Sequence, residues 1–583
     1  MSYAAPVAEM RFLVEELAGL EDPELAEAIL KEAARFAETV LAPLNQPADR
    51  AGSRLENGVV RTPPGFREAY AQYVAGGWNG LAASPEHGGQ GLPASLAVPV
   101  AEMWSSAAMS FALCPLLNWG ALELLAAHGS PAQKALYLDK LTSGEWTGTM
   151  NLTEPQAGSD LGALRTRAVP AADVPGGEFY RITGQKIFIT YGDHDLADNI
   201  VHMVLARTPE APSGSRGISL FIVPKFLPAS DGRTGERNAV RTLRLEEKLG
   251  IHASPTCVLA FEEALGWRVG EENRGLEGMF TMMNSARLHV GVQGVAIAER
   301  AYQRARDFAG ERVQGRPLGA PPAAEALPII HHPDVRRMLL WMRAASEAMR
   351  ALAYYTAATI DRSRAAPDQA AREAASRRVD LLIPVVKAWC TDLAVAVAST
   401  GLQVHGGMGY IEETGAAQHL RDARILPIYE GTNGIQARDL VGRKLAGDRG
   451  EAARSLFGEM RQTASAAAGS SAAGMAGIGR TLAAAISTAE SATTHLLQVE
   501  PAAAAAGARP YLELFGAVAG GWLLARLALA AERQIAAKAD DRGFLAAKCA
   551  TARAYAEQFL ALAPGYLAAI QGGSVLDFPL DAF

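Results

Sequence analysis

The stretch LTEPQAGSD, residues 152–160, lies where the pattern of the chain changes. Before it, from about residue 22 to 145, apolar residues recur at the three- and four-residue spacing of helices, as in PELAEAILKEAARFAETVLAPL. After it come short segments rich in β-branched and aromatic residues and bounded by turn residues, such as FYRITGQKIFIT and NIVHMVLAR. A polar insertion, LPASDGRTGERN, has the composition of a surface hairpin between two such segments. The sequence therefore predicts a helical unit followed by an antiparallel β unit.

Helical periodicity returns from about Leu276. Three long helices are expected over residues 275–313, 331–360 and 377–407, the last of them bent at Pro384. An Ala-rich helical region follows from about Asp448. We therefore expect an α+β multidomain fold with a helical N-terminal domain (1–146), a middle antiparallel β domain (147–272), a four-helix bundle (273–447) and an extra C-terminal helical domain (448–583). The absence of repeated βα units argues against a doubly wound nucleotide-binding fold.

The overall composition excludes several function classes. The 583 residues carry a net charge of −7, which provides no general attraction for nucleic acid or an anionic membrane. The four cysteines lie far apart without a CxxC pair, which argues against a zinc ribbon and a disulfide framework. No secretion signal is apparent, and no uninterrupted apolar run approaches the roughly 20 residues of a membrane span. We expect a cytoplasmic protein with no membrane span and no metal site.

Three motifs can each be interpreted in two ways. The hydroxyls of Thr153 and Ser159 could face a cofactor ring and its phosphates, or could bond the backbone of a helix-to-strand connector. In GQKIFITYG, Phe188 and Thr190 share a strand face, either as a platform for a flat heterocycle or as one packed face of a sheet. In GLQVHGGMGYIEE, the adjacent glycines 406 and 407 either allow a ligand to approach the backbone or only cap a helix.

The fourth motif is ILPIYEGTNGIQ, residues 425–436, which places Glu430 in the turn that opens a helix. As a first-turn acid, this carboxylate would gain about 0.3–1 kcal/mol from the helix dipole. The preceding residues are apolar, however, and a carboxylate in an apolar pocket has a raised pKa and can act as a base toward a weakly acidic C–H. Both interpretations stay open on this motif alone.

Together and in this order, the motifs resemble the acyl-CoA dehydrogenase family over roughly residues 35–445. They are SPEHGGQGLP, LTEPQAGSD, GQKIFIT, RLHVGVQGVAIAERA with ERVQGRPLG, and QVHGGMGY with LRDARILPIYEGTNGIQ. The tail beyond residue 447 resembles a bacterial long-form branch, which includes dehydrogenases of 3-methylthiopropionyl-CoA and of fatty acyl-CoAs of broad chain length. The resemblance implies a helical domain, a β domain and a four-helix bundle, with FAD between the last two.

The resemblance also implies which residues bind FAD. Those expected at the flavin of the same subunit are Met150, Leu152, Thr153, Gly158, Ser159, Phe188, Ile189, Thr190 and Thr432. Those whose family equivalents hold the FAD of a neighbouring subunit are Arg312, Gln403, Val404, Gly406 and Gly407. The second group implies at least a homodimer, or a dimer of dimers.

By the same resemblance, Glu430 removes the α-proton of an acyl-CoA thioester while a β-hydride passes to flavin N5, which yields a trans-2-enoyl-CoA. Some family members carry the base on an earlier helix, where this chain has Ala286, which cannot act as one. Many members have Asp at the position of Asn284, so this departure bears on how the pantetheine arm is held. The expected substrate-binding residues are Ser159, Asn284, Arg287, Tyr429 and Gly431.

Electron-transferring flavoprotein is the acceptor that the resemblance implies. One alternative is an acyl-CoA oxidase that uses O₂ as acceptor. A second is a non-catalytic relative that binds DNA through a basic tail, but residues 448–583 carry 11 Lys and Arg against 12 Asp and Glu.

Overall fold

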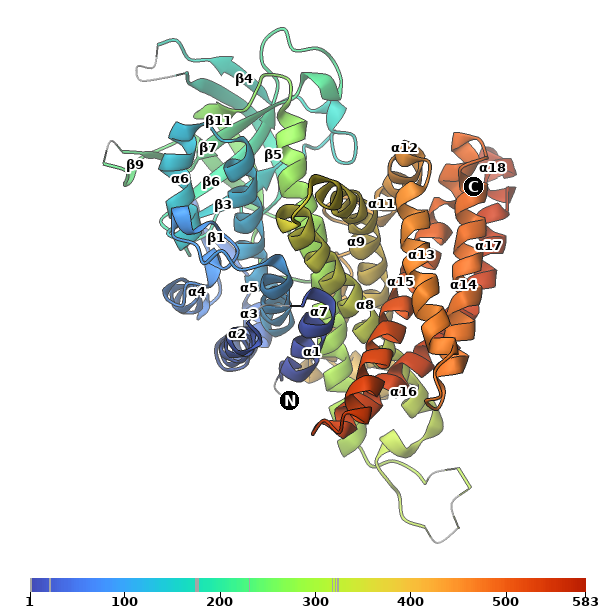
Figure 1. Cartoon of the computed structure of the whole chain (residues 1–583). Helices are drawn as coiled ribbons and strands as arrows, with labels where there is room; N and C mark the ends of the chain where they lie inside the picture. The colour runs from blue at the N-terminus through green and yellow to red at the C-terminus, as the bar shows by residue number, and fades with distance from the viewer. Residues whose placement is uncertain are drawn as a thin grey trace.

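The computed structural model describes residues 3–19, 22–173, 178–229, 231–316, 318–319, 321 and 324–582. The β strands gather at one end of the molecule, and helices form the rest (Figure 1). The last helices of the chain lie along the side of the central helices that faces away from the sheet (Figure 1). The fold is thus the predicted arrangement of helical, β, helical and helical parts.

The N-terminal part is helical, as its periodicity predicts. Its helices are α1 (Val7–Ala18), α2 (Pro23–Phe36), α3 (Ala42–Ala51), α4 (Phe66–Ala75), α5 (Ala94–His128) and α6 (Pro131–Ser143), with a hairpin of β1 (Arg54–Glu56) and β2 (Val59–Arg61). Helix α5 is buried along almost its whole length and packs on both the sheet and α7. A capping box between Ser130 and Gln133 starts α6, with Pro131 in its first turn.

Within the part of the chain that the structure describes, the main sheet has seven strands, and it is mixed rather than antiparallel. Its order is β3 (Trp146–Asn151), β6 (Asn199–Ala206), β7 (Ser219–Pro224), β11 (Thr256–Val269), β5 (Tyr180–Thr190) and β4 (Arg167–Pro170), with β10 (Val240–Leu245) also on β11. Strand β3 pairs with β6 in parallel, from Trp146↔Asn199 to Asn151↔Val204, which corrects the antiparallel prediction. The predicted hairpin is present as β8 (Phe226–Pro228) and β9 (Thr234–Arg237); residue 230 of this insertion lies outside the described residues.

Long helices return after the sheet. They are α7 (Gly275–Glu311), α8 (Pro333–Ala365) and α9 (Gln369–His405), followed by α10 (Ala416–Ala423), α11 (Asn433–Asp439), the π-helical η9 (Leu440–Leu445) and α12 (Ala446–Asp448). Helix α9 continues through Pro384 without a non-helical residue, so the expected bend does not interrupt it. Helix α7 packs on α5, α8 and α9, and is therefore the central helix of the bundle.

The C-terminal region covers this bundle. Its helices are α13 (Glu451–Ala468), α14 (Met475–Leu496), α15 (Pro501–Ala536), α16 (Arg542–Gln558), α17 (Ala563–Gln571) and α18 (Ser574–Asp577). Gly516 and Gly520 of α15 lie against the Trp389 ring of α9, so closely that an added Cβ would come within 2.3 Å and 2.8 Å of it. Buried Lys548 of α16 bonds Glu9 of α1 at 2.5 Å and Glu347 of α8 at 2.7 Å.

Among the described residues, four helical segments are long and apolar enough, by length and composition alone, to cross a membrane, which corrects the expectation that no segment qualifies. They are Ala94–His128, Gln369–Tyr410, Pro501–Ala536 and Arg542–Asp577. In the first three, 89%, 78% and 89% of the most apolar window is buried inside the protein, against 24% in the fourth. The apolar character of the first three therefore serves internal packing, which an unbroken-run criterion on the sequence does not detect.

Candidate active site

A cavity of about 760 Å³ lies where the β unit meets the helical bundle. Its walls come from the loop after β3, the end of β5, one face of α7, and the turn and helix that follow residue 429. Of the residues predicted to bind cofactor, substrate or proton, it is lined by Met150, Leu152, Thr153, Gly158, Ser159, Phe188, Ile189, Arg287, Glu430 and Gly431. The structure thus brings together motifs that lie nearly 300 residues apart in the sequence.

The loop at residues 152–160 connects two β strands, not a helix to a strand as expected. It is held by buried Glu154, whose carboxylate accepts from the N–H groups of Arg165 and Thr166, and from the Thr166 hydroxyl. Lys186 of β5 donates to Glu154 at 2.8 Å and to the Leu152 carbonyl at 2.9 Å. Burial opposes ionisation of Glu154, but Lys186 and the hydrogen bonds from Thr166 and Arg165 together outweigh it and lower the pKa of the carboxyl to about 2. An ionised, fully bonded pair therefore fixes the backbone beside Thr153.

Phe188 lies at a bulge in β5, where Ile187 and Phe188 stand opposite the single residue Val258. Its backbone φ of +60° is unusual for an aromatic residue. Its side chain is 60% exposed, whereas Ile189 is buried. The regular alternation expected for this strand is therefore broken, and the aromatic ring faces the cavity instead of the sheet core.

Glu430 lies in the turn before α11 and does not cap that helix. The cap is Thr432, whose Oγ1 accepts from the Ile435 N–H at 3.3 Å. Glu430 and Gly431 both have left-handed backbone conformations, with φ of +54° and +84°. Within the described part of the chain, the Glu430 carboxylate makes no hydrogen bond or ion pair. It faces the cavity, and the capping interpretation of this residue is wrong.

Burial raises the pKa of Glu430 to about 7, although the positive charges of Lys387 and Arg287 oppose the shift. A carboxyl with this pKa is half ionised near neutral pH and is a stronger base than an exposed glutamate. Arg287 of α7 lines the same cavity, and its Nη1 bonds the Asn284 Oδ1 at 3.4 Å. The cavity therefore combines a carboxyl group of raised pKa with a buried cation.

One face of α7 contributes residues that the motifs did not identify. Leu276, Phe280 and Met283 line the cavity together with Arg287, at the spacing of one helical face. Extending the helical periodicity backwards from Arg287 would have identified them from the sequence. They make this wall of the cavity largely apolar.

A second group of unpredicted lining residues lies on α11 and η9. These are Ile435, Arg438, Asp439, Gly442 and Arg443, again on one face. Arg443 bonds Asp439 and lies 5.7 Å from the centre of the Phe280 ring. The remaining unpredicted lining residues are Asp160, Leu161, Gly162 and Ser215.

Several predicted residues do not line this cavity. Thr190 and Thr432 each follow a lining residue in the sequence but do not line the cavity themselves. The Tyr429 hydroxyl points elsewhere and donates to Gln293 of α7. Asn284 reaches the cavity only through Arg287. The remaining residues are absent from its lining and lie at the ends of α7 and α9: Arg312, Gln403, Val404, Gly406 and Gly407. All of these except Val404 are exposed.

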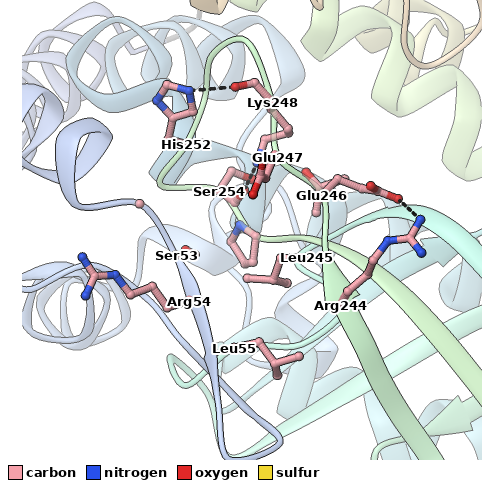
Figure 2. A pocket seen from close by; sticks show the side chains of 13 residues that line it. Ser53, Arg54, Leu55, Arg244, Leu245, Glu246, Glu247, Lys248, His252 and Ser254 are labelled. Atoms are coloured by element: carbon pink, nitrogen blue, oxygen red, sulfur yellow. Dashed lines mark hydrogen bonds and ion pairs between the residues drawn. The ribbon is translucent and has the colours of Figure 1, made fainter.

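A second pocket, of about 590 Å³, shares no lining residue with the first. It lies between residues 52–55 and the segment 244–256, with Arg54 and Arg244 on opposite sides (Figure 2). Three of its basic groups are already bonded: Arg244 to Glu246, Lys248 to the Ser254 carbonyl, and His252 to the Lys248 carbonyl. It contains none of the predicted site residues.

The residues around Glu430 fit a flavin. An exposed aromatic ring, apolar Met150, Leu152 and Ile189, and a polar loop are suited to a flat heterocycle with polar edges. At Gly158 of that loop, an added Cβ would have nothing within 4 Å, so the backbone is open to a ligand. Across the described residues no group of three His, Cys, Asp or Glu side chains could hold a metal ion.

Comparison with known proteins agrees with this arrangement. Family models of acyl-CoA dehydrogenases match the chain: the N-terminal domain at 23–145, the middle domain at 149–264 and the C-terminal domain at 273–446. The model described as acetyl-CoA dehydrogenase C-terminal like matches residues 456–579.

Two relatives and one solved structure match along nearly the whole chain. The 3-methylmercaptopropionyl-CoA dehydrogenase of Ruegeria pomeroyi is 51% identical over 96% of each chain. The broad-specificity linear acyl-CoA dehydrogenase FadE5 of Mycobacterium tuberculosis is 34% identical over 93% of this chain and 91% of its own. ACDH-11 of Caenorhabditis elegans, solved with C11-CoA, has the same fold with a TM-score of 0.78 at 22% identity, over 96% of this chain and 92% of its own. The chain therefore belongs to the acyl-CoA dehydrogenase family, whose members are oxidoreductases with FAD as cofactor.

Proposed function

We propose that Glu430 is the catalytic base of an FAD-dependent α,β-dehydrogenation of an acyl-CoA thioester. The observation that carries this proposal is a carboxylate that faces the cavity, has no protein partner among the described residues, and has a pKa raised by burial to about 7. A carboxylate already paired with a cation would have to break that pair before it could accept a proton.

In this proposal Glu430 takes the α-proton of the thioester, and the electrons of that C–H bond form the new Cα–Cβ double bond. FAD bound in the cavity supplies the acceptor for the hydride that leaves Cβ. The backbone N–H of Glu430 donates to the thioester oxygen, where negative charge develops. The apolar face of α7 excludes water and so preserves the basicity of the carboxylate.

The loop from Met150 to Ser159, together with Phe188 and Ile189, would hold the flavin, with Thr190 and Thr432 at its periphery. Ser159, Arg287 and Gly431 would contact the substrate, and Asn284 and Tyr429 would position Arg287 and the turn. Arg312, Gln403, Val404, Gly406 and Gly407 would hold the FAD of a neighbouring subunit. The exposure of the four other than Val404, away from the cavity of their own chain, supports a homodimer or a dimer of dimers.

The substrate proposed first is 3-methylthiopropionyl-CoA, and fatty acyl-CoAs come second. The names of the relatives at 51% and 34% identity support this order. The apolar lining, with Met150, Met283 and Phe280, suits an uncharged acyl group.

Three further expectations belong to this proposal. The domains would span residues 1–146, 147–272, 273–447 and 448–583, which the ranges of the four family models support. Electron-transferring flavoprotein would reoxidise the enzyme, and the enzyme would act in the cytoplasm. The acceptor follows from the family resemblance.

Anaerobic titration of the FAD-loaded protein with a panel of acyl-CoAs tests the proposal. The panel contains 3-methylthiopropionyl-, butyryl-, octanoyl- and palmitoyl-CoA, and bleaching of the visible flavin band is followed. We expect the first to bleach the flavin at the lowest concentration. A flavin that none of the thioesters bleaches would contradict the proposal. Rapid reoxidation by O₂ in place of electron-transferring flavoprotein would favour an oxidase.

A further inference from the structure

Lys387 of α9 has a buried amino group without a carboxylate partner among the described residues. Its side chain has no solvent exposure. Its Nζ donates to the Gly431 carbonyl at 2.8 Å and to the Asn433 Oδ1 at 2.8 Å, both of which are uncharged. No carboxylate lies within ion-pair distance of it among the described residues. Because a buried, unpaired charge is costly, its presence beside the Glu430 turn needs a reason.

The two acceptors of Lys387 belong to the turn that carries Glu430. Asn433 adds two further contacts with α9, since its Nδ2 donates to the Ala388 carbonyl at 3.1 Å and to the Thr391 Oγ1 at 2.9 Å. On the other side of Glu430, Tyr429 bonds Gln293 of α7. Glu430 therefore lies between one anchor on α7 and one on α9.

This double anchoring explains the backbone of the turn. Glu430 and the following Gly431 both adopt left-handed conformations, which are unfavourable for a residue with a side chain. Such a conformation persists only where the surrounding structure holds it. The bond from Lys387 to the Gly431 carbonyl acts directly on the peptide next to Glu430.

Lys387 also acts on Glu430 through its charge. Its positive charge is one of the two that oppose the raised pKa of Glu430; the other belongs to Arg287 of α7. Burial in turn lowers the pKa of Lys387 to about 7. The negative charges of Glu430 and Asp392 oppose this shift, and the positive charges of Arg287 and Arg509 add to it. The charge on Lys387 and that on Glu430 are therefore coupled in the pH range in which the enzyme would work.

We propose that Lys387 is a positioning residue of the active site, which holds the Gly431–Asn433 turn so that Glu430 faces the cavity and whose ammonium stabilises the carboxylate form of Glu430. The inference rests on the proposed role of Glu430 as the base. Lys387 contacts neither the cavity nor a reacting atom, since it is absent from the cavity lining.

Four variants, compared as FAD-loaded proteins, separate the anchoring of the turn by Lys387 from the effect of its charge. Lys387→Met removes both the anchor and the charge, and Lys387→Gln keeps hydrogen-bond donors without the charge. Asn433→Ala weakens the anchor and keeps the charge. The matched control is Lys548→Met, because Lys548 is equally buried but bonds Glu9 and Glu347, far along the chain from Glu430.

The measurement is the rate of flavin reduction by an acyl-CoA, under anaerobic conditions and from pH 5.5 to 9. The acid limb is the part of the pH profile in which the rate falls as the pH decreases. For Lys387→Met we expect the pH at the midpoint of this limb to rise by about 1 unit. Its limiting rate should fall by about 100-fold, because a displaced base reacts poorly. Lys387→Gln should show the same shift with a smaller loss of rate, and Asn433→Ala a loss of rate without the shift. Lys548→Met should lower the melting temperature and keep the wild-type acid limb.

A second readout is independent of turnover. A 3-thia-acyl-CoA has an acidic α-proton but no hydrogen at the β position, so it can be deprotonated without reducing the flavin. The pH at which its enolate forms, seen as a long-wavelength charge-transfer band, should rise in Lys387→Met and Lys387→Gln. If Lys387→Met and Lys387→Gln both keep the wild-type acid limb and the wild-type pH of enolate formation, the inference is overturned while the proposed function stands. A wild-type protein whose flavin no acyl-CoA reduces would overturn the proposed function and the inference with it.

Discussion

At the scale of single residues, Glu430 has an unusual local geometry. Its capping role is taken by Thr432, its backbone is left-handed, and its carboxylate faces a cavity. These features separate it from the other acids of the bundle, such as Glu299 and Glu347, which are bonded to arginines. A free carboxylate inside a largely apolar cavity is suited to accept a proton from carbon.

The pH dependence follows from the raised pKa of Glu430. The base is active only when ionised, so kcat/KM should be half-maximal near pH 7, approach its plateau above that pH and fall toward tenfold per unit well below it. Steady-state rates with one acyl-CoA from pH 5 to 9 check this expectation. An acid limb near pH 4.5, the value of an unperturbed glutamate, would contradict it.

At the scale of elements, the sequence predicts most helices and strands but not the irregular points. The helical periodicity of α7, α8 and α9 is long and regular, so their positions were predicted to within a few residues at most ends. The bulge at Phe188 and the parallel pairing of β3 were missed, because both depend on which strand lies alongside and not on local composition.

The contacts of Lys186 with Glu154 and Leu152, which hold the loop at residues 152–160, give a prediction at this scale. Replacing Lys186 by Met leaves the Glu154 carboxylate buried without its partner, which should cost about 3–5 kcal/mol and loosen residues 152–159. We expect the dissociation constant of FAD, measured by fluorescence, to rise at least tenfold. Lys225→Met removes a similar ion pair with Asp193 that does not contact the loop, and should lower stability with FAD affinity retained. Equal FAD affinity in Lys186→Met and the wild type would contradict the idea that the Lys186–Glu154 ion pair holds the loop for FAD binding.

The candidate site was predicted in part, for reasons that can be stated residue by residue. Glu430, Arg287 and the loop around Thr153 belong to short motifs whose order along the chain identified them. Phe280 and Arg443 were not predicted, because they line the cavity as members of helical faces and not of a motif. Lys387 was not predicted because it contacts Gly431, 44 residues away in the sequence, and no local motif contains such a contact. Residues that act through tertiary contacts of this kind are beyond the reach of motif analysis.

At the scale of the whole molecule, the C-terminal region is part of the same packed body as the bundle. Gly516→Ala should place a Cβ 2.3 Å from the Trp389 ring and destabilise the protein by about 1–3 kcal/mol. Gly458→Ala makes the same change in helix α13, where nothing lies within 4 Å, and should stabilise by about 0.5–1 kcal/mol. Urea unfolding of both variants measures the difference. Equal midpoints would contradict the tight contact between α15 and α9.

Subunit complementation tests whether two chains share each FAD. Glu430→Gln removes the base of its own site, and Arg312→Ala should weaken FAD binding in the site of the partner. A mixed dimer of these two single variants should therefore regain one working site, about half of the wild-type activity. A mixed dimer of the double variant with the wild type should have none. Half activity in the mixture of the double variant with the wild type would contradict a shared FAD site.

The most direct test of the central claim is anaerobic mixing of Glu430→Gln with the acyl-CoA that best bleaches the wild-type flavin. Glutamine keeps the size of the side chain and cannot accept the α-proton. We expect the variant to retain FAD and bind the thioester, while the rate of flavin bleaching falls by about 10³-fold or more. Bleaching at a rate within tenfold of the wild type would show that another group removes the proton and would contradict the account.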